Sequence, residues 1–380
     1  MKKILIVTAS TGAGHNSVAS SIRQALDQQG NGQVTVDVVD FLAQETWICK
    51  PLLLYASIIV SYPWLWGVIY SLSNNGHFCR FFRALVSKIS SNPMAHLLQR
   101  HAPTALICVH PLCNQIIAES LKRTRLPTLL ITVVTDLDEA HTAWIAPEVS
   151  LYIAPTEEVR DSLRARGIPP QCISLLGLPV DGRFYRDRPD SSQTGQIAEQ
   201  KDALTLFLTG GGEGAGAILP AAQAISRAQL PVRLIVACGR NDALRQKLER
   251  SSLTVPCRVL GFQDNIHLLM EAVDVVIGKA GAVTIGEAIV AQKPLIILSP
   301  LPGQERGNVE FVIRHGLGLA VKRTAQLIRV LKHWIANSGE MEELVVRAKE
   351  FRHEWSQAGP QAARAILSLI ESGETTPHRR

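Results

Sequence analysis

The chain has 380 residues, 46% of them hydrophobic and 19% charged, with a net charge of +6. This length exceeds one ordinary core and predicts two domains of roughly 150 to 200 residues each. The charge suits a nucleic acid or an anionic membrane surface, and composition alone does not separate the two. Seven cysteines without a CxxC pair indicate reduced, packed thiols in a cytosolic protein.

The first half of the chain predicts a parallel sheet. Short, apolar, β-branched runs alternate here with helix-like segments, as in strands covered on both faces. These runs are residues 4–9, 34–40, 105–110, 128–136 and 151–155. We therefore expect a doubly wound domain over residues 1–176. Because the first run leads straight into a glycine turn, it is interpreted as a strand and not as a signal peptide.

An uncharged aromatic segment follows the second predicted strand. No Asp or Glu occurs in residues 46–118, and residues 51–79 carry no charge. Aromatic rings beside cations are typical of a membrane interface. The aromatic residues are Trp47, Tyr55, Tyr62, Trp64, Trp66 and Tyr70, and the cations that follow are Arg80, Arg83 and Lys88.

Residues 52–70 are almost numerous enough to span a bilayer. Pro63, Ser57 and Ser61 weaken a spanning helix, so we expect an interfacial or acceptor-lining segment. A buried pair of helices and a true span are the alternatives. The cations are interleaved with an apolar run, which argues against a nucleic acid partner.

The second half repeats the pattern of strands and helices. Its apolar runs are residues 204–210, 232–239, 258–262, 274–279 and 294–300. Residues 177–202 are polar and rich in Gly, Pro, Ser and Gln, which predicts a linker. A second doubly wound domain is therefore expected over residues 203–380.

A glycine turn with a histidine follows the first predicted strand. Residues 8–15 read TASTGAGH, and the amides of Gly12 and Gly14 could approach an anion at the start of the helix. No Gly-Lys-Ser/Thr follows, so this is not a P-loop. The alternative is a tight turn in which His15 faces solvent.

The second domain begins with a comparable loop. Residues 207–216 read FLTGGGEGAG, and such a loop can turn backbone amides toward a diphosphate, with a flexible loop as the alternative. The loop residues expected to do so are Gly211, Gly212, Glu213 and Gly214.

Polar residues end several other predicted strands. Gln304, Glu305 and Asn308 follow one such strand, and groups of this kind suit a hydroxyl-rich ligand such as a sugar. A rigid surface turn is the alternative. Asp136 ends another strand and could cap a helix instead. Thr284 to Glu287 has the form of a capping box, which would use the carboxylate structurally.

Together these motifs resemble a known enzyme family. GKAGAVTIGEA and PLPGQERGN are similar to the donor-binding signature of the monogalactosyldiacylglycerol synthase and diacylglycerol glucosyltransferase family (glycosyltransferase family 28). That family includes the lipid-linked N-acetylglucosaminyltransferase of peptidoglycan synthesis. Further similar motifs are ILIVTASTGAGHNSVASSI, VHPLCNQ, VVTDLDEAHTAW, GLPVDGRF and FLTGGGEGAG.

The resemblance implies two Rossmann-like domains facing a cleft, the GT-B fold, in which the last helix often crosses back to the first domain. It also implies a UDP-sugar site in the second domain. Glu287 would grip the ribose, Phe262 would mark the uracil pocket, and the sugar hydroxyls would meet Gln304, Glu305 and Asn308. The phosphates would lie near Gly281, Ala282, Val283 and Thr284, with help from Lys279 or Arg306.

For the first domain the resemblance implies acceptor binding and catalysis. An imidazole titrates near the operating pH, so His15 is the expected general base, with Asp136 as a competing base or as its partner. The resemblance assigns acceptor and membrane binding to Gly12, Gly14, His110, Tyr62, Trp64, Trp66, Arg80 and Arg83.

The implied reaction is an inverting transfer of galactose or glucose from a UDP-sugar to diacylglycerol, with a β linkage, on the cytoplasmic face of a membrane. No cofactor or metal is expected, because the only DxD pair, Asp136 to Asp138, lies in the first domain. The alternatives are a polyprenyl-linked acceptor, a nonhydrolysing UDP-sugar epimerase, and a catalytically silent membrane-binding or nucleic-acid-binding protein.

Overall fold

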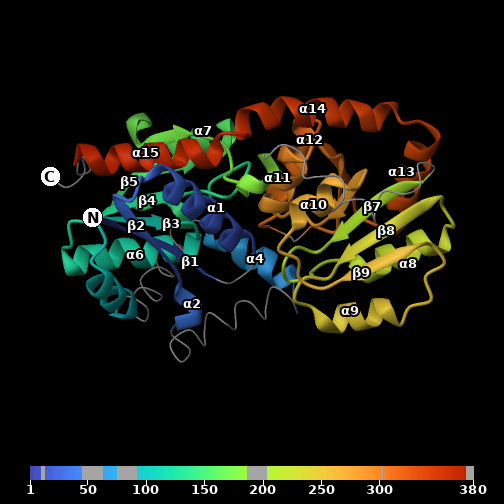
Figure 1. The fold of residues 1–380 in the computed structure, drawn as a ribbon, viewed down its shortest axis with the longest axis horizontal. Coiled ribbons are helices and arrows are strands. Elements are labelled where there is room, and N and C mark those ends of the chain that lie inside the picture. The colour runs from blue at the N-terminus through green and yellow to red at the C-terminus, as the bar shows by residue number, and fades with distance from the viewer. Residues whose placement is uncertain (10–12, 45–62, 75–91, 186–202, 301–302, 374–380) are drawn as a thin grey trace.

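Two separate sheets organise the chain in the computed structural model, one in each of two lobes (Figure 1). The structure describes residues 1–9, 13–44, 63–74, 92–185, 203–300 and 303–373. Both sheets have six strands, and every strand pair is parallel. The predicted α/β class with two doubly wound, Rossmann-like domains is therefore confirmed.

The first sheet has the order β2-β1-β3-β4-β5-β6. Its strands are β1 (Lys2–Thr8), β2 (Val34–Asp40), β3 (Ala105–Cys108), β4 (Leu129–Val133), β5 (Val149–Ala154) and β6 (Ile173–Leu175). The central strands are buried along their whole length, as their continuous apolar runs predict. The sequence did not predict β6, a short and partly exposed edge strand.

The helices of the first lobe cover both faces of this sheet (Figure 1). They are α1 (Ala13–Gln29), α2 (Phe41–Gln44), α4 (Pro63–Ser73), α6 (Pro111–Thr124) and α7 (Glu157–Ala165). One core packs α1 against the sheet through Val18, Ile22 and Leu26. A second core lies on the opposite face and includes Ile117 and Trp144.

The second sheet has the order β12-β11-β10-β7-β8-β9. Its strands are β7 (Leu204–Thr209), β8 (Val232–Ala237), β9 (Cys257–Leu260), β10 (Val275–Gly278), β11 (Leu295–Leu298) and β12 (Gly318–Val321). The edge strand β12 was not predicted, because its four residues, GLAV, are too few to show a pattern.

Helices also flank the second sheet, and the chain then returns to the first lobe. They are α8 (Ile218–Arg227), α9 (Asp242–Glu249), α10 (Ile266–Glu271), α11 (Ala282–Val290), α12 (Arg306–Arg314), α13 (Thr324–Ala336), α14 (Gly339–Trp355) and α15 (Ala358–Ser372). Figure 1 shows α14 lying along the second lobe and α15 lying beside α1 in the first lobe. The Lys2 Nζ donates to the carbonyl of Ile370 at 3.1 Å, which ties the end of α15 to the first strand.

Strand order reverses once in each sheet, and this reversal determines where a ligand can bind. In the first sheet the chain leaves β1 toward β2 and returns on the other side to β3. In the second sheet the reversal lies between β7 and β10. In parallel α/β sheets, ligands bind beyond the carboxyl ends of the strands at such a switch point.

Among the described residues, no helix is long and apolar enough to cross a membrane. The segment 52–70 lies mostly outside these residues, and only its end forms part of α4.

Candidate active site

A cleft of about 580 Å³ lies where the two switch points face each other. Residues of both domains line it: His15 and Asp136 come from the first domain, and the loops after β7, β10 and β11 contribute from the second. The predicted catalytic and donor-binding groups therefore meet in one place, although they are far apart in the sequence.

His15 lies in the first turn of α1 and lines the cleft. Its Nδ1 is 2.7 Å from the carbonyl oxygen of Val109, at the end of β3. Because a carbonyl oxygen can only accept, Nδ1 carries the proton in this bond, and Nε2 of the neutral ring keeps its lone pair. The ring is thus in the tautomer that a general base requires.

Burial lowers the pKa of His15 to about 4. The bond to Val109 opposes this shift, and the charge of Lys279 adds to it. The imidazole is therefore unprotonated at neutral pH and can accept a proton.

His110 serves the structure of the first domain. It is the N-cap of α6, and its Nδ1 accepts from the amide of Leu112 at 3.2 Å. Its side chain is buried, with its ring centroid 4.4 Å from that of His15. It is not among the described residues that line the cleft. His110 therefore packs behind His15 in this structure.

Asp136 lines the cleft and is held by Trp144. The indole Nε1 of Trp144 donates to the Asp136 Oδ2 at 2.7 Å. Burial raises the pKa of Asp136 to about 6, although this hydrogen bond lowers it. The helix-cap alternative for Asp136 is wrong, because the next helical turn begins at Thr142 with His141 as its N-cap.

The glycine loop after β7 packs tightly against two neighbours. Gly214 has a φ of +58°, and a Cβ there would lie 2.0 Å from the Cys238 carbonyl oxygen. A Cβ at Gly212 would lie 2.1 Å from the Cβ of Ala13, in the other domain. Only glycine permits these approaches. The loop thus packs closely against the start of α1.

The N-terminus of α11 opens into the same cleft. Gly281 is its N-cap, and Ala282, Val283 and Thr284 form its first turn and line the cleft. The capping-box alternative is wrong, because Thr284 lies inside the helix and does not cap it. Glu287 consequently has no capping function.

Glu287 lines the cleft one turn further along α11. Burial raises the pKa of Glu287 to about 8, and the negative charge of Asp181 adds to the shift. Within the described part of the chain, its carboxyl group makes no hydrogen bond. The side chain is half-buried, so its carboxyl group is open to a ligand in the cleft.

Glu305 was predicted to contact sugar hydroxyls, and the structure gives it protein partners. Its Oε1 pairs with Lys279 Nζ at 3.0 Å, and its Oε2 accepts from the amide of Ala280 at 3.1 Å. The carboxylate is 3% exposed. Gln304 and Glu305 both line the cleft. Glu305 thus fixes Lys279 beside the glycine loop, where a Cβ at Gly211 would lie 3.6 Å from the Lys279 Cε.

Phe262 is an exposed aromatic residue in the wall of the cleft. The guanidinium of Arg240 lies over its ring, 4.2 Å from the centroid, and also pairs with Glu213 at 3.1 Å. Both Phe262 and Arg240 line the cleft. Sequence reasoning did not single out Arg240, although its place directly after β8 could have revealed it.

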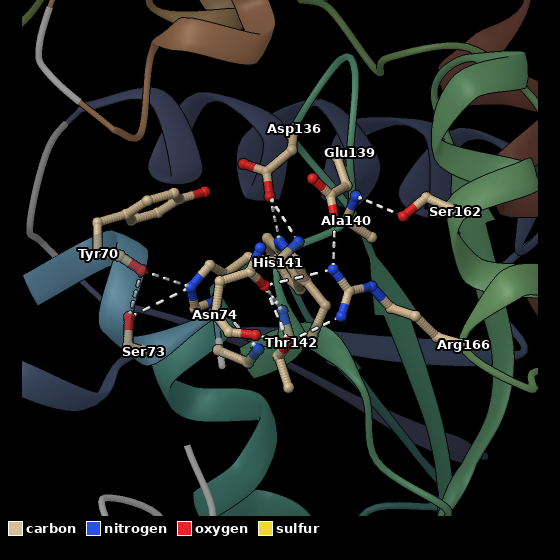
Figure 2. A network of polar contacts seen from close by, with 12 residues as sticks. Tyr70, Ser73, Asn74, Asp136, Glu139, Ala140, His141, Thr142, Ser162 and Arg166 are labelled. Carbon is tan, nitrogen blue, oxygen red and sulfur yellow. Dashed lines mark hydrogen bonds and ion pairs between the residues drawn. The ribbon is translucent and has the colours of Figure 1, made fainter. Parts of the chain in front are cut away.

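A second cavity of about 360 Å³ adjoins the first, and Asp136, Gln304 and Asn308 line both. Its remaining lining is polar and includes Tyr70 and Glu139. Figure 2 shows the network behind it, in which Tyr70 and Asp136 are turned toward the same space.

This network joins α4 to the loop after β4 (Figure 2). His141 Nε2 lies 3.3 Å from the carbonyl oxygen of Tyr70, and Thr142 Oγ1 donates to Asn74 at 2.8 Å. Arg166 donates to Thr142 at 2.8 Å and pairs with Glu139. This network could not be predicted from the sequence, because its members come from three separate segments.

Some predicted residues are not described by the structure. Gly12, Tyr62, Arg80 and Arg83 lie outside the described residues, and the side chains of Trp64 and Trp66 in α4 are not described. Gly14 lines the cleft, and a Cβ there would lie 3.4 Å from Val283. The described residues contain no group of three or more His, Cys, Asp or Glu side chains that could hold a metal ion.

Solved structures share this architecture at low sequence identity. The MurG of Acinetobacter baumannii is 16% identical, with a TM-score of 0.59 over 98% of this chain and 100% of that chain. The spinosyn rhamnosyltransferase SpnG is 13% identical, with a TM-score of 0.65 over 97% and 100%. The UDP-GlcNAc 2-epimerase of Neisseria meningitidis is 13% identical, with a TM-score of 0.66 over 98% and 100%. These matches confirm the GT-B fold alone.

Sequence comparisons give the family. A family model for monogalactosyldiacylglycerol (MGDG) synthase matches residues 15–180, and one for the glycosyltransferase family 28 C-terminal domain matches residues 205–352. A probable MGDG synthase 2 of Oryza sativa subsp. japonica is 31% identical over 99% of this chain and 81% of its own length. The MGDG synthase of Spinacia oleracea is 30% identical over 88% of this chain, which spans 66% of that relative. The chain therefore belongs to the monogalactosyldiacylglycerol synthase family of glycosyltransferases.

Proposed function

We propose that this glycosyltransferase transfers a hexose, galactose or glucose, from a UDP-sugar to diacylglycerol and inverts the anomeric centre. The observation that carries the proposal is the placement of His15 across one cleft from Glu287, Lys279 and the N-terminus of α11. A base on one wall and groups suited to a nucleotide diphosphate on the other are what a single displacement needs.

The second domain provides the proposed donor site. The Glu287 carboxyl group lacks a hydrogen bond among the described residues and would satisfy both ribose hydroxyls. The diphosphate would meet the amides at the start of α11 and the Lys279 ammonium. Phe262 and Gln304 both line the cleft, and we assign the uracil to Phe262 and the sugar to Gln304, which also borders the second cavity.

In the proposed reaction, the acceptor hydroxyl attacks the anomeric carbon from the face opposite UDP. The hydroxyl proton passes to Nε2 of His15, and UDP leaves with the bonding electron pair. Asp136 borders both cavities and would orient the acceptor hydroxyl. The developing charge on UDP is met by amides and Lys279, so we propose that turnover needs no divalent metal.

We further propose that the protein is peripheral, on the cytoplasmic face of a membrane. Two observations support this. The uncharged aromatic segment 51–79 is followed by Arg80, Arg83 and Lys88. Its end in α4 borders the second cavity next to Asp136, so an acceptor bound at a membrane surface would be near the reacting groups.

The test is a transfer assay with labelled UDP-galactose and UDP-glucose, each offered with diacylglycerol or with a polyprenyl-linked sugar. A labelled hexosyl diacylglycerol that forms in the presence of EDTA supports the proposal. Label on the polyprenyl lipid alone would move the acceptor to the alternative class. Conversion of the nucleotide sugar to an epimer without any lipid product would show that the protein is an epimerase.

A further inference from the structure

Asn308 lies at the junction of the two domains, in the first turn of α12. Its side chain is only 6% exposed. The Nδ2 donates to the carbonyl oxygen of Ala280 at 2.9 Å, and the Oδ1 accepts from the amide of Leu137 at 3.1 Å. Both ends of the side-chain amide are therefore engaged by backbone groups, one in each domain.

The contact with Leu137 fixes the chain directly after Asp136. Further contacts hold the same loop from α12: Arg314 pairs with Asp138 at 2.8 Å, and a Cβ at Gly307 would lie 3.0 Å from the Asp138 Cβ. The carboxylate of Asp136 is meanwhile bound by Trp144 of its own domain. Asp136 is thus held by an indole from one side and by the neighbouring backbone from the other.

The contact with Ala280 reaches the proposed phosphate site. Ala280 stands between Lys279 and the N-cap of α11, and its own amide donates to Glu305. A ligand that moves the backbone at Ala280 would therefore move the Asn308 side chain. Asn308 would in turn move the backbone at Leu137, to which it is hydrogen-bonded.

We propose that Asn308 is a positioning residue, which links the donor loop at Ala280 to the backbone beside Asp136 and so sets Asp136 against the acceptor hydroxyl when the domains close. The inference rests on the proposed function and assigns Asn308 a different task from the sugar contact that the sequence suggested. A misplacement of about 1 Å at a reacting group can lower a rate about 100-fold, so a contact of this kind affects turnover strongly.

The test is a double-mutant cycle with Asn308→Ala and Asp136→Asn, measured as single-turnover transfer to lipid. Asn308→Ala is expected to lower the rate about 10-fold to 100-fold and to leave the Kd of UDP and of UDP-hexose within about twofold. In a protein that already carries Asp136→Asn, Asn308→Ala should lower the transfer rate less than about twofold. The reason is that Asp136, through which Asn308 is proposed to act, is already disabled.

The pH profile of kcat/KM separates a positioning role from a general loss of stability, because a loss of stability alone would not shift its acidic limb. Burial raises the pKa of Asp136, so freeing its loop to water should lower that pKa and shift the acidic limb of kcat/KM to lower pH. The matched control is Arg314→Met, which removes the exposed contacts to Asp138 and Glu158 in the same interface. Arg314→Met should lower kcat less than about threefold and leave the acidic limb of kcat/KM at the same pH.

Three outcomes would overturn the inference. The first is that the rate effects of Asn308→Ala and Asp136→Asn are additive, and the second is that Asn308→Ala leaves the acidic limb of kcat/KM in place. The third is a loss of affinity for UDP-hexose but not for UDP, which would make Asn308 a sugar contact. If Asn308→Ala does not fold, the smaller change Asn308→Ser enters the same cycle. A wild-type protein that binds UDP-hexose but glycosylates no lipid would instead refute the proposed function.

Discussion

The Nδ1 of His15 lies 2.7 Å from the carbonyl oxygen of Val109, at the switch point between β1 and β3. This one bond fixes both the orientation and the tautomer of the ring. The histidine keeps the lone pair of Nε2 on the wall of the cleft that faces the proposed donor site.

His15→Ala should therefore lower turnover by about 100-fold or more, because the acceptor hydroxyl loses its base. The affinity for UDP should stay near that of the wild type, since the donor groups lie on the other domain. Transfer rates and calorimetric titration with UDP measure the two effects. If turnover persists in this variant and Asp136→Asn abolishes it, Asp136 is the base.

The pH dependence of transfer should reflect two groups with opposite shifts. Burial raises the pKa of Asp136 to about 6 and lowers the pKa of His15 to about 4. Both act in their unprotonated forms, so kcat/KM should fall as the pH drops through about 6. In Asp136→Asn the remaining limb should move toward pH 4. A limb that stays near 6 in this variant would show that Asp136 is not the titrating group.

Glu287→Ala should weaken UDP binding by about 1.5 to 3 kcal/mol, the range for lost hydrogen bonds to a charged group. Titration calorimetry measures this loss. An unchanged affinity would remove Glu287 from the donor site.

The same carboxyl group should reduce the stability of the empty protein at high pH. The pKa of Glu287 is about 8 in the folded protein, above its usual value of 4.5, so the folded state retains a proton that the unfolded state has released. Stability therefore declines as the pH rises from 4.5 toward 8. Glu287→Gln removes this titration, and its melting temperature should exceed that of the wild type most clearly near pH 8.

Gly212→Ala should impair transfer by keeping the domains apart, because the added Cβ would lie 2.1 Å from the Cβ of Ala13. We expect a loss of about 10-fold in turnover with UDP affinity near wild type. Ala13→Gly removes the opposing atom, so the double variant should recover most of the activity. A failure of this rescue, or a loss of UDP binding, would place the effect of Gly212 inside the second domain.

The aromatic segment should bind anionic membranes reversibly. Flotation with phosphatidylglycerol vesicles should exceed flotation with neutral vesicles, and high salt should release part of the protein, since the attraction is screened over roughly 8 to 10 Å. Trp64→Ala with Trp66→Ala should reduce flotation and lipid glycosylation together and leave UDP binding intact. Equal flotation on both vesicle types, resistant to salt and carbonate, would indicate a spanning helix instead.

The central strands were predictable because burial on both faces leaves a continuous hydrophobic run, as in β3 and β11. The edge strands β6 and β12 have three and four residues and gave no comparable signal. Within the site, the glycine turn after the first strand drew attention to His15, whereas the role expected for Glu287 came from the resemblance to the family. The partners Val109, Trp144 and Leu137 could not be predicted, because each contact depends on tertiary packing between distant segments.

The central claim is a single displacement that builds a β-hexosyl diacylglycerol. The most direct measurement is the anomeric configuration of the lipid formed from UDP-galactose or UDP-glucose, read from the coupling of the anomeric proton by NMR. We expect a β-linked hexose on the free hydroxyl of diacylglycerol, and its formation should be about 100-fold slower or more in His15→Ala. An α-linked product, or wild-type protein that binds UDP but leaves diacylglycerol unmodified, would contradict it.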